Sequence, residues 1–212
     1  MHRLAALLLA LLLPACALQP DYIEVRAPAP QVSTPVPGAE RVRLAVETRD
    51  NRPFRDRVSN KINGYGMEMA PIVATNDVIV ETREAISADL RGRGFQFNGN
   101  DGRLELEFSR FYSRFQTGFW SGSANAEISL NVRALAPDGR IVFSRVFNAE
   151  AVLPGVGLAN GSNAKLALDM ALARLVRMVG DDQDLLRALA GLAPAPAPTP
   201  DPEPVRRRRV GV

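Results

Sequence analysis

The chain has 212 residues, 46% of them apolar and 23% charged, a composition that excludes both a disordered polymer and a membrane-embedded bundle. Its formal net charge of +3 comes from the two ends, because 21 basic and 21 acidic residues remain when residues 1–15 and 193–212 are set aside. A neutral body lacks the basic face that nucleic acids require, so we expect no nucleic-acid partner.

Residues 1–15 have the order of a secretory signal, with a basic start, an apolar run and a small residue before Cys16. The apolar run, residues 4–13, is too short for a bilayer core that needs about 20 residues. The block Leu13-Pro14-Ala15-Cys16 resembles a bacterial lipobox, in which the thiol receives a diacylglycerol and the cysteine becomes the new N-terminus. This resemblance implies an acylated, palmitate-bearing cysteine. An ordinary cleaved signal beside a chance cysteine is the alternative.

The counts of cysteine and histidine limit the possible chemistry. Cys16 is the only cysteine, and His2, which lies within the predicted signal, is the only histidine. The mature chain therefore has no disulfide, no Ser-His-Asp or Cys-His nucleophile, and no zinc site built from histidine or cysteine. We expect no metal, no cofactor and no enzymatic activity.

Composition divides the chain into four segments. Residues 1–15 are the predicted signal, and residues 16–38 are the lipidated cysteine and a Pro-rich tether that holds the domain away from the lipid. Residues 39–192 form one domain, and residues 193–212 are a second Pro-rich, disordered segment. This tail ends in an arginine cluster that is predicted to contact anionic lipid head groups or acidic cell-wall polymers, with simple disorder as the alternative. The cluster comprises Arg206, Arg207, Arg208 and Arg209.

The first half of the domain predicts a strand and a helix. Residues 42–46 alternate apolar and polar side chains, as a half-buried strand does, and a turn follows at residues 49–53. Residues 72–74 are compatible with a short strand. A helix then runs from Asn76, its predicted N-cap, to about Arg93, because apolar residues recur there at spacings of four and seven.

The second half predicts several strands followed by helices. Strands at residues 95–97, 104–108, 124–136 and 140–150 are joined by turn sequences, which makes an antiparallel meander.

Two helices follow these strands. Ser162 is the predicted N-cap of the first, which ends at Gly180, and Asp181 or Asp182 caps the second. Strands grouped together between helices indicate an α+β fold. We predict an antiparallel, mostly meander sheet with two to three helices packed on one face.

Three segments resemble the YajG family of bacterial lipoproteins. They are the turn Asp50-Asn51-Arg52-Pro53, the helix end Arg93-Gly94-Phe95 and residues 163–189. The resemblance spans roughly residues 40–190 together with the lipobox. Because the family has no assigned activity, the resemblance implies a class and a location but no mechanism.

Three other patterns have possible catalytic interpretations, and a structural role is favoured for each. Ser162-Asn163-Ala164-Lys165 has the S-x-x-K spacing of a penicillin-binding nucleophile, but no K-T-G motif exists in the chain. The glycines within residues 155–161 are spaced one residue too widely for a dinucleotide-binding loop. Glu105 and Glu107 share one strand face, which we interpret as a solvated outer face and not as an acid–base pair.

Six of the thirteen aromatic residues lie within residues 108–120. Strand alternation places Phe108 and Tyr112 on one side and Phe111 and Phe115 on the other, so both sides cannot face the same core. One side is therefore either covered by another element or exposed beside arginines, as in binding hot spots and membrane interfaces. The predicted partner or lipid patch comprises Arg110, Phe111, Arg114, Phe115, Phe119 and Trp120.

These observations predict a non-catalytic lipoprotein that acts as a binding or assembly module in envelope maintenance. Ala17 follows Cys16. In enteric lipoproteins, which the lipobox resembles, an aspartate at this position tends to retain the protein at the inner membrane. The resemblance therefore implies the outer membrane of a Gram-negative bacterium, with the domain facing the periplasm. The predicted partners are the lipid bilayer, through the acylated cysteine, and an envelope protein, lipid or cell-wall component. An accessory subunit of an ABC-type lipid or solute transport system is the alternative, and a hydrolase working through carboxylates alone is another.

Overall fold

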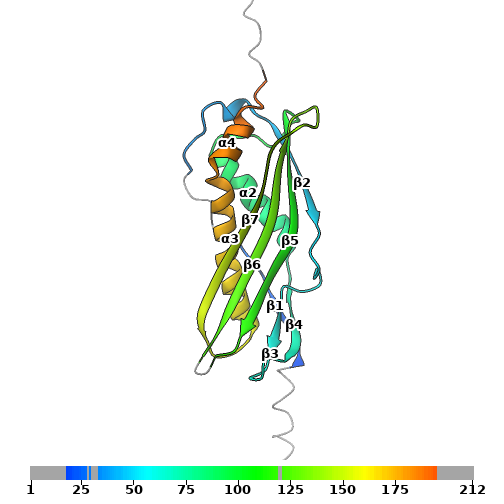
Figure 1. Ribbon diagram of the computed structural model, residues 1–212, viewed down its shortest axis with the longest axis vertical. Coiled ribbons are helices and arrows are strands. Elements are labelled where there is room, and N and C mark those ends of the chain that lie inside the picture. The colour runs from blue at the N-terminus through cyan, green and yellow to red at the C-terminus, as the bar shows by residue number, and fades with distance from the viewer. Residues whose placement is uncertain (1–17, 28, 30–32, 119–120, 195–212) are drawn as a thin grey trace, which may run out of the picture.

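The computed structural model of the chain describes residues 18–27, 29, 33–118 and 121–194 and has a mixed α+β fold (Figure 1). The described strands form a three-stranded sheet of order β1-β4-β3 and a four-stranded sheet of order β2-β5-β6-β7. The strands are β1 (Asp21–Ile23), β2 (Leu44–Asp50), β3 (Ser59–Ile62), β4 (Glu68–Ala74), β5 (Gly102–Gln116), β6 (Gly122–Leu135) and β7 (Ile141–Val156). The α-helices are α2 (Val78–Gly92), α3 (Gly161–Gly180) and α4 (Gln183–Ala190).

The four-stranded sheet contains the predicted meander but differs in its first member. β5, β6 and β7 are consecutive antiparallel neighbours, whereas the strand on the other side of β5 is β2, which runs parallel to it. Parallel neighbours need a crossover connection, and β3, β4 and α2 supply it. Residues 95–97 do not form the predicted strand. Gln96 makes only a single bridge, to Arg43, and Phe95 is buried in the core.

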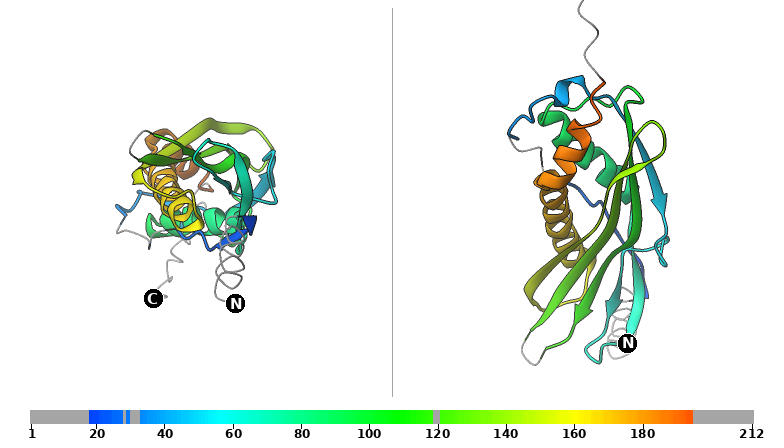
Figure 2. Two further views of the ribbon diagram at one scale, coloured as in Figure 1. Left: turned by 90° about the horizontal axis from the view of Figure 1, so that it is seen from below. Right: turned by 45° about the horizontal axis from the view of Figure 1, so that its top comes forward.

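The helices cover one face of the four-stranded sheet, as predicted (Figure 2). α3 packs on β5, β6 and β7, α2 packs on β2 and α3, and α4 packs on β6 and β7. Leu168, Leu172, Leu175 and Val179 recur at spacings of three and four, so they form one stripe of α3, and all four are fully buried. We call the opposite side of this sheet the outer face.

The cap of α2 lies one residue later than expected. The Asp77 carboxylate accepts hydrogen bonds from the backbone N–H groups of Ile79 at 2.9 Å and Val80 at 3.2 Å. Asn76, the predicted cap, instead holds the backbone of Val25 with both ends of its amide, at 3.0 and 2.7 Å. The polar side chain before the helix is thus used for a contact between distant parts of the chain.

The other two caps follow the same chemistry. At α3 the cap is Asn160 and not Ser162, because the Asn160 side chain accepts a hydrogen bond from the N–H of Asn163 at 3.0 Å. Asp182, one of the two predicted candidates, caps α4 and accepts from the N–H of Leu185 at 2.9 Å. Any short polar side chain in this position can satisfy the free N–H groups of a first turn, so neighbouring candidates look alike in sequence.

The predicted tether, residues 16–38, is in large part built into the folded body. β1 pairs in parallel with β4, Val25 is fully buried, and the N–H of Val36 donates to the carbonyl of Arg93 at 2.9 Å. Prolines suit an extended segment that contributes few N–H donors to a ladder. The expectation of a free spacer was therefore wrong for the described part of this segment.

Asp21 connects β1 to two other elements. Its carboxylate accepts a hydrogen bond from the N–H of Gly161 at 2.7 Å and pairs with Lys61 of β3 at 2.6 Å. A negative charge is favourable there because Gly161 begins helix α3. A Cβ added to Gly161 would lie 2.9 Å from the Cβ of Asp21 and 2.9 Å from the Cγ2 of Ile23, so glycine permits this close approach.

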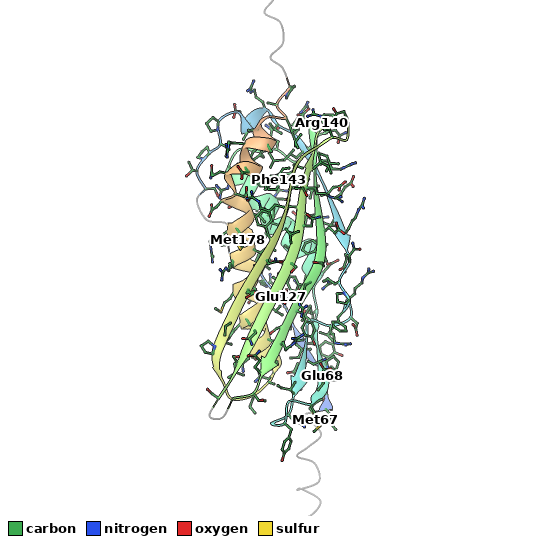
Figure 3. All side chains as sticks on the ribbon, viewed as in Figure 1. Met67, Glu68, Glu127, Arg140, Phe143 and Met178 are labelled. Carbon is green, nitrogen blue, oxygen red and sulfur yellow. The ribbon has the colours of Figure 1, made fainter. Side chains whose placement is uncertain are left out.

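The elongated molecule has two ends of different composition (Figure 1). The basal end contains the β3–β4 turn, the β7–α3 loop and the adjoining ends of β5 and β6, and the distal end contains the β6–β7 turn and α4. Figure 3 places Met67 at the basal end and Arg140 at the distal end. Among the described residues, no helix has the length and apolar character needed to span a bilayer.

Candidate functional site

A bulge in β5 decides which of its side chains face solvent. Phe108 pairs with Leu130 of β6, and Arg110 pairs with the adjacent Ser129, so Ser109 is an extra residue in the β5 strand. An extra residue of this kind shifts the inward–outward alternation of everything that follows it. The second half of β5 therefore has the opposite phase from the one that unbroken alternation predicts.

This shift places three phenylalanines on the helix-facing side of β5. Phe108, Phe111 and Phe115 are exposed to 0%, 1% and 6% respectively. The predicted patch was therefore wrong for Phe111 and Phe115, which are core residues and are not available to a partner. Arg110 and Arg114, also predicted, do lie on the outer face, where they alternate with the inward side chains.

The structure leaves the other predicted site residues undescribed. They are Cys16, Phe119, Trp120, Arg206, Arg207, Arg208 and Arg209, all outside the described residues.

Tyr112 lies between Arg110 and Arg114 on the outer face of β5. The ring of Phe54, from the loop between β2 and β3, has its centre 5.6 Å from that of Tyr112 at an interplanar angle of 42°. The guanidinium carbon of Arg57 lies 4.4 Å from the centre of the Phe54 ring. Aromatic and cation–π contacts of this kind hold side chains in defined positions. We call these five residues the Tyr112 surface.

The turn after β2 holds Phe54 in place. Arg52, which is 8% exposed, donates from Nε and Nη2 to the two carboxylate oxygens of Asp50 at 2.8 and 2.9 Å. The N–H of Asn51 donates to the carbonyl of Phe108 at 2.8 Å, which ties the turn to β5. The hydrogen bond from Arg52 lowers the pKa of Asp50 and keeps the pair charged. The turn that carries the family resemblance is thus a brace beneath the Tyr112 surface.

Two hollows have Arg110, Tyr112 and Arg114 as a shared wall. One, of about 170 Å³, extends to Phe54 and the turn that holds it. The other, of about 390 Å³, extends across β6 to Val152 of β7. The Tyr112 side chain is therefore the border between two depressions, a shape that can receive side chains of a partner on both sides.

Charges on this surface are mixed. Arg110 Nε lies 2.8 Å from the carboxylate of Glu127 on β6. The ordinary pKa of tyrosine, about 10, already keeps the phenol protonated at neutral pH, and burial, followed by the nearby Glu68 carboxylate, raises the pKa of Tyr112 further. The Tyr112 hydroxyl can therefore donate a hydrogen bond. A phenol, an aromatic face and exposed guanidinium groups such as that of Arg114 suit the recognition of a carboxylate beside an apolar group.

Glu105 is less exposed to solvent than the sequence predicts. It does lie on the outer face of β5, but it is only 6% exposed, because Arg133 at 2.8 Å and Arg103 at 3.3 Å cover its carboxylate. The neighbouring Glu107 accepts a hydrogen bond from the side chain of Asn51 at 2.6 Å. Both carboxylates therefore serve cross-strand contacts.

The remaining sequence patterns also have structural roles. Lys165 of the S-x-x-K pattern pairs with Asp169, one turn further along α3. The glycine-containing segment is partly a strand, since β7 continues to Val156. Within the part of the chain that the structure describes, no group of three carboxylate, cysteine or histidine side chains is placed to hold a metal ion.

Sequence reasoning missed Phe54 and Arg57 as members of the candidate site. They lie in residues 54–75, where no periodic pattern is present, and only the fold brings them to β5. One local signal for the bulge does exist. Phe108 and Phe111 are three residues apart, whereas an unbroken strand brings apolar residues to one face at even spacings.

Two solved structures show what the chain is similar to. A protein of the DUF330 family from Xanthomonas campestris is similar at 19% identity, with 81% of this chain and 96% of that chain covered and a TM-score of 0.51. A minor lipoprotein from Acinetobacter baumannii is similar at 11% identity, with 66% of this chain and 94% of that chain covered and a TM-score of 0.38. At these identities the first likeness supports the fold alone. No curated protein matched the sequence.

Sequence comparison with protein families is more specific. Residues 28–190, from the Pro-rich segment to the end of α4, match a family described as uncharacterized lipoprotein. The match includes both sheets except β1, all three α-helices and every residue of the Tyr112 surface. The chain therefore belongs to the YajG family of uncharacterized lipoproteins.

Proposed function

We propose that the chain is acylated on Cys16 and acts at the periplasmic face of the outer membrane as a non-catalytic binding module in envelope maintenance. Membership of a lipoprotein family supports attachment to a membrane, and the sequence around the cysteine supports the position of the attachment. The observation that carries the binding role is the Tyr112 surface, because it joins the residue types of a binding hot spot to preformed hollows.

The side chains of the Tyr112 surface contact one another and the turn beneath them. Phe54 packs against Tyr112 and Arg57, and the turn beneath it is held by the pair between Arg52 and Asp50. A side chain that is fixed before binding loses little conformational entropy on binding, which leaves more of the contact energy for affinity. The partner that fits is an envelope protein segment that presents a carboxylate to Arg114 and an apolar side chain to the hollow next to Phe54.

Site-specific photocrosslinking in cells tests this role. A photoreactive amino acid in place of Arg114 should form a crosslinked product, and the same replacement at the exposed Arg140 of the distal end should not. Tyr112→Ala should reduce the product severalfold while the amount of protein and its circular dichroism spectrum stay unchanged. Equal crosslinking at positions 114 and 140, or a product indifferent to Tyr112→Ala, would contradict a role for this surface.

Acylation and sorting need a separate measurement. The mass of the N-terminal peptide from purified protein should show acyl chains on Cys16, and density-gradient fractions should place the protein with outer-membrane markers. Cys16→Ser should abolish the lipid-modified peptide. Recovery of the full-length protein in soluble form with an unmodified thiol would refute the membrane assignment.

A further inference from the structure

Three stretches of the chain without charged residues meet at the basal end of the domain, where the exposed Glu68 borders the first of them (Figure 3). Residues 62–67, 115–118 and 151–164 contain no Asp, Glu, Lys or Arg, although 23% of the whole chain is charged. These three stretches are far apart in sequence, yet parts of all three line one cavity between the small sheet and the ends of β5 and β7. Burial of a charge in a bilayer is costly, so a surface free of charge is compatible with contact to lipid.

Large apolar side chains project from these loops. Tyr65 in the β3–β4 turn is 91% exposed, Met67 in the same turn is 58% exposed, and Leu158 in the β7–α3 loop is 73% exposed. The side-chain oxygen of Asn63 accepts hydrogen bonds from the N–H groups of Tyr65 at 2.9 Å and Met67 at 3.0 Å. The turn is thereby closed on itself and directs its apolar side chains outward, at the basal tip where Figure 3 labels Met67.

A cavity at the basal end adds apolar surface behind these exposed side chains. It has a volume of about 620 Å³, and its walls include Ile62, Met69, Phe115 and Val156. Its one charged wall residue, Lys61, pairs with Asp21 at 2.6 Å. The cavity therefore continues the uncharged character of the loops into the body.

The anchor point lies close to the same end. β1 begins at Asp21, five residues after Cys16, and Asp21 is held by Gly161 and Lys61. Because an extended chain spans at most about 3.6 Å per residue, an acylated Cys16 lies within roughly 18 Å of Asp21. Acyl chains on this residue bring the bilayer to the basal end and leave no room for a long spacer.

We propose that the basal end docks on the phospholipid bilayer that holds the acyl chains of Cys16, with Tyr65, Met67 and Leu158 in the interfacial region. This inference rests on the acylation in the proposed function. Tyrosine is favoured at membrane interfaces because its ring is apolar and its hydroxyl reaches water. The distal end then faces away from the membrane, and the Tyr112 surface is presented at the side of an upright domain.

Depth-dependent quenching of a fluorophore tests the docking. Acylation occupies the only native thiol, so a cysteine introduced at Tyr65, Leu158 or Arg140 can be labelled specifically in the full-length acylated protein. In vesicles of phosphatidylcholine and phosphatidylethanolamine, brominated lipids should quench labels at positions 65 and 158 severalfold more than the label at position 140. The difference should persist in high salt, because uncharged loops do not depend on ion pairing.

A charged substitution provides a second readout. Leu158→Asp should reduce the quenching of a label at position 65, whereas Ile141→Asp, a matched change at an exposed residue of the distal end, should not. If acylated, vesicle-bound protein keeps all three labels in water, the docking is refuted while the proposed function stands. If the mass shows no acyl chains, both the proposed function and the docking fall.

Discussion

On its helix-facing side β5 carries Phe108, Phe111 and Phe115, all buried, whereas its outer side carries Arg110, Tyr112 and Arg114. The two sets come from the same short stretch of sequence, and unbroken alternation would mix them. The bulge at Ser109 separates them, because one extra residue changes the side on which every later residue lies. The comparison teaches that a single unpaired residue separates one aromatic segment into a buried core side and a polar outer side.

The largest effect should come from a deletion that reverses which side chains of β5 face inward after the bulge. Deleting Ser113 should turn Arg114 inward and Phe115 outward, so we expect loss of cooperative unfolding. Deleting Ser109 is the matched control, since it removes the bulge and keeps Arg110 outside. Urea denaturation followed by circular dichroism would compare the two variants. A folded protein after deletion of Ser113, together with an unfolded one after deletion of Ser109, would contradict the inward and outward positions assigned to β5.

Truncating an inward side chain of β5 to alanine should lower the free energy of unfolding much more than truncating an outward one. Phe111→Ala should lower the free energy of unfolding by about 3–5 kcal/mol, because it removes a fully buried ring and leaves a cavity. Tyr112→Ala should lower it by only about 1 kcal/mol, the scale of one partly exposed aromatic pair. Urea denaturation measures both values, and Tyr112→Ala should also reduce crosslinking at position 114. Equal losses of stability would mean that the outer ring is structural.

Acid should weaken the outer face through Asp50. Its pKa is lowered in the folded state by the hydrogen bond from Arg52, so its contribution to stability is complete above the unfolded value, about 4. That contribution is lost as the pH falls through the lower folded pKa. We expect the free energy of unfolding to decrease below about pH 4, and Asp50→Asn should flatten this dependence.

Asp138 offers the matched control for that titration. Its pKa is also lowered, chiefly by the backbone N–H of Arg140, but the carboxylate is exposed in the β6–β7 turn of the distal end. Exposed charges are screened by solvent and contribute little. Asp138→Asn should therefore leave the dependence of the free energy of unfolding on pH nearly unchanged. If Asp138→Asn changed this dependence as much as Asp50→Asn does, the pair between Asp50 and Arg52 would not contribute more than an exposed carboxylate.

Several parts of this fold could be predicted because their signals are local. The buried stripe of α3 follows from leucines three and four residues apart, and β6 follows from the alternation of residues 124–136. Capping was less predictable, because the cap of α3 is Asn160 and not Ser162 of the S-x-x-K pattern. Local periodicity could not identify β2 as the parallel neighbour of β5, since that pairing joins segments more than fifty residues apart.

The candidate site was less predictable than the fold. Arg110 and Arg114 were found from sequence, but Phe111 and Phe115 were placed on the surface although they are buried. Phe54 was missed because its partner is brought to it by the fold. A binding surface is a property of neighbours in space, and the sequence records only neighbours along the chain.

The amino-acid sequence alone determined the helices, the β5–β7 meander, the resemblance of residues 13–16 to a lipobox and the uncharged character of three separate stretches. Only the tertiary structure decided that these stretches meet at the basal end, that β1 is part of the body and that Tyr112 faces outward. The physical reason is that side-chain periodicity depends on adjacent residues, whereas strand pairing and bulges depend on contacts between distant ones.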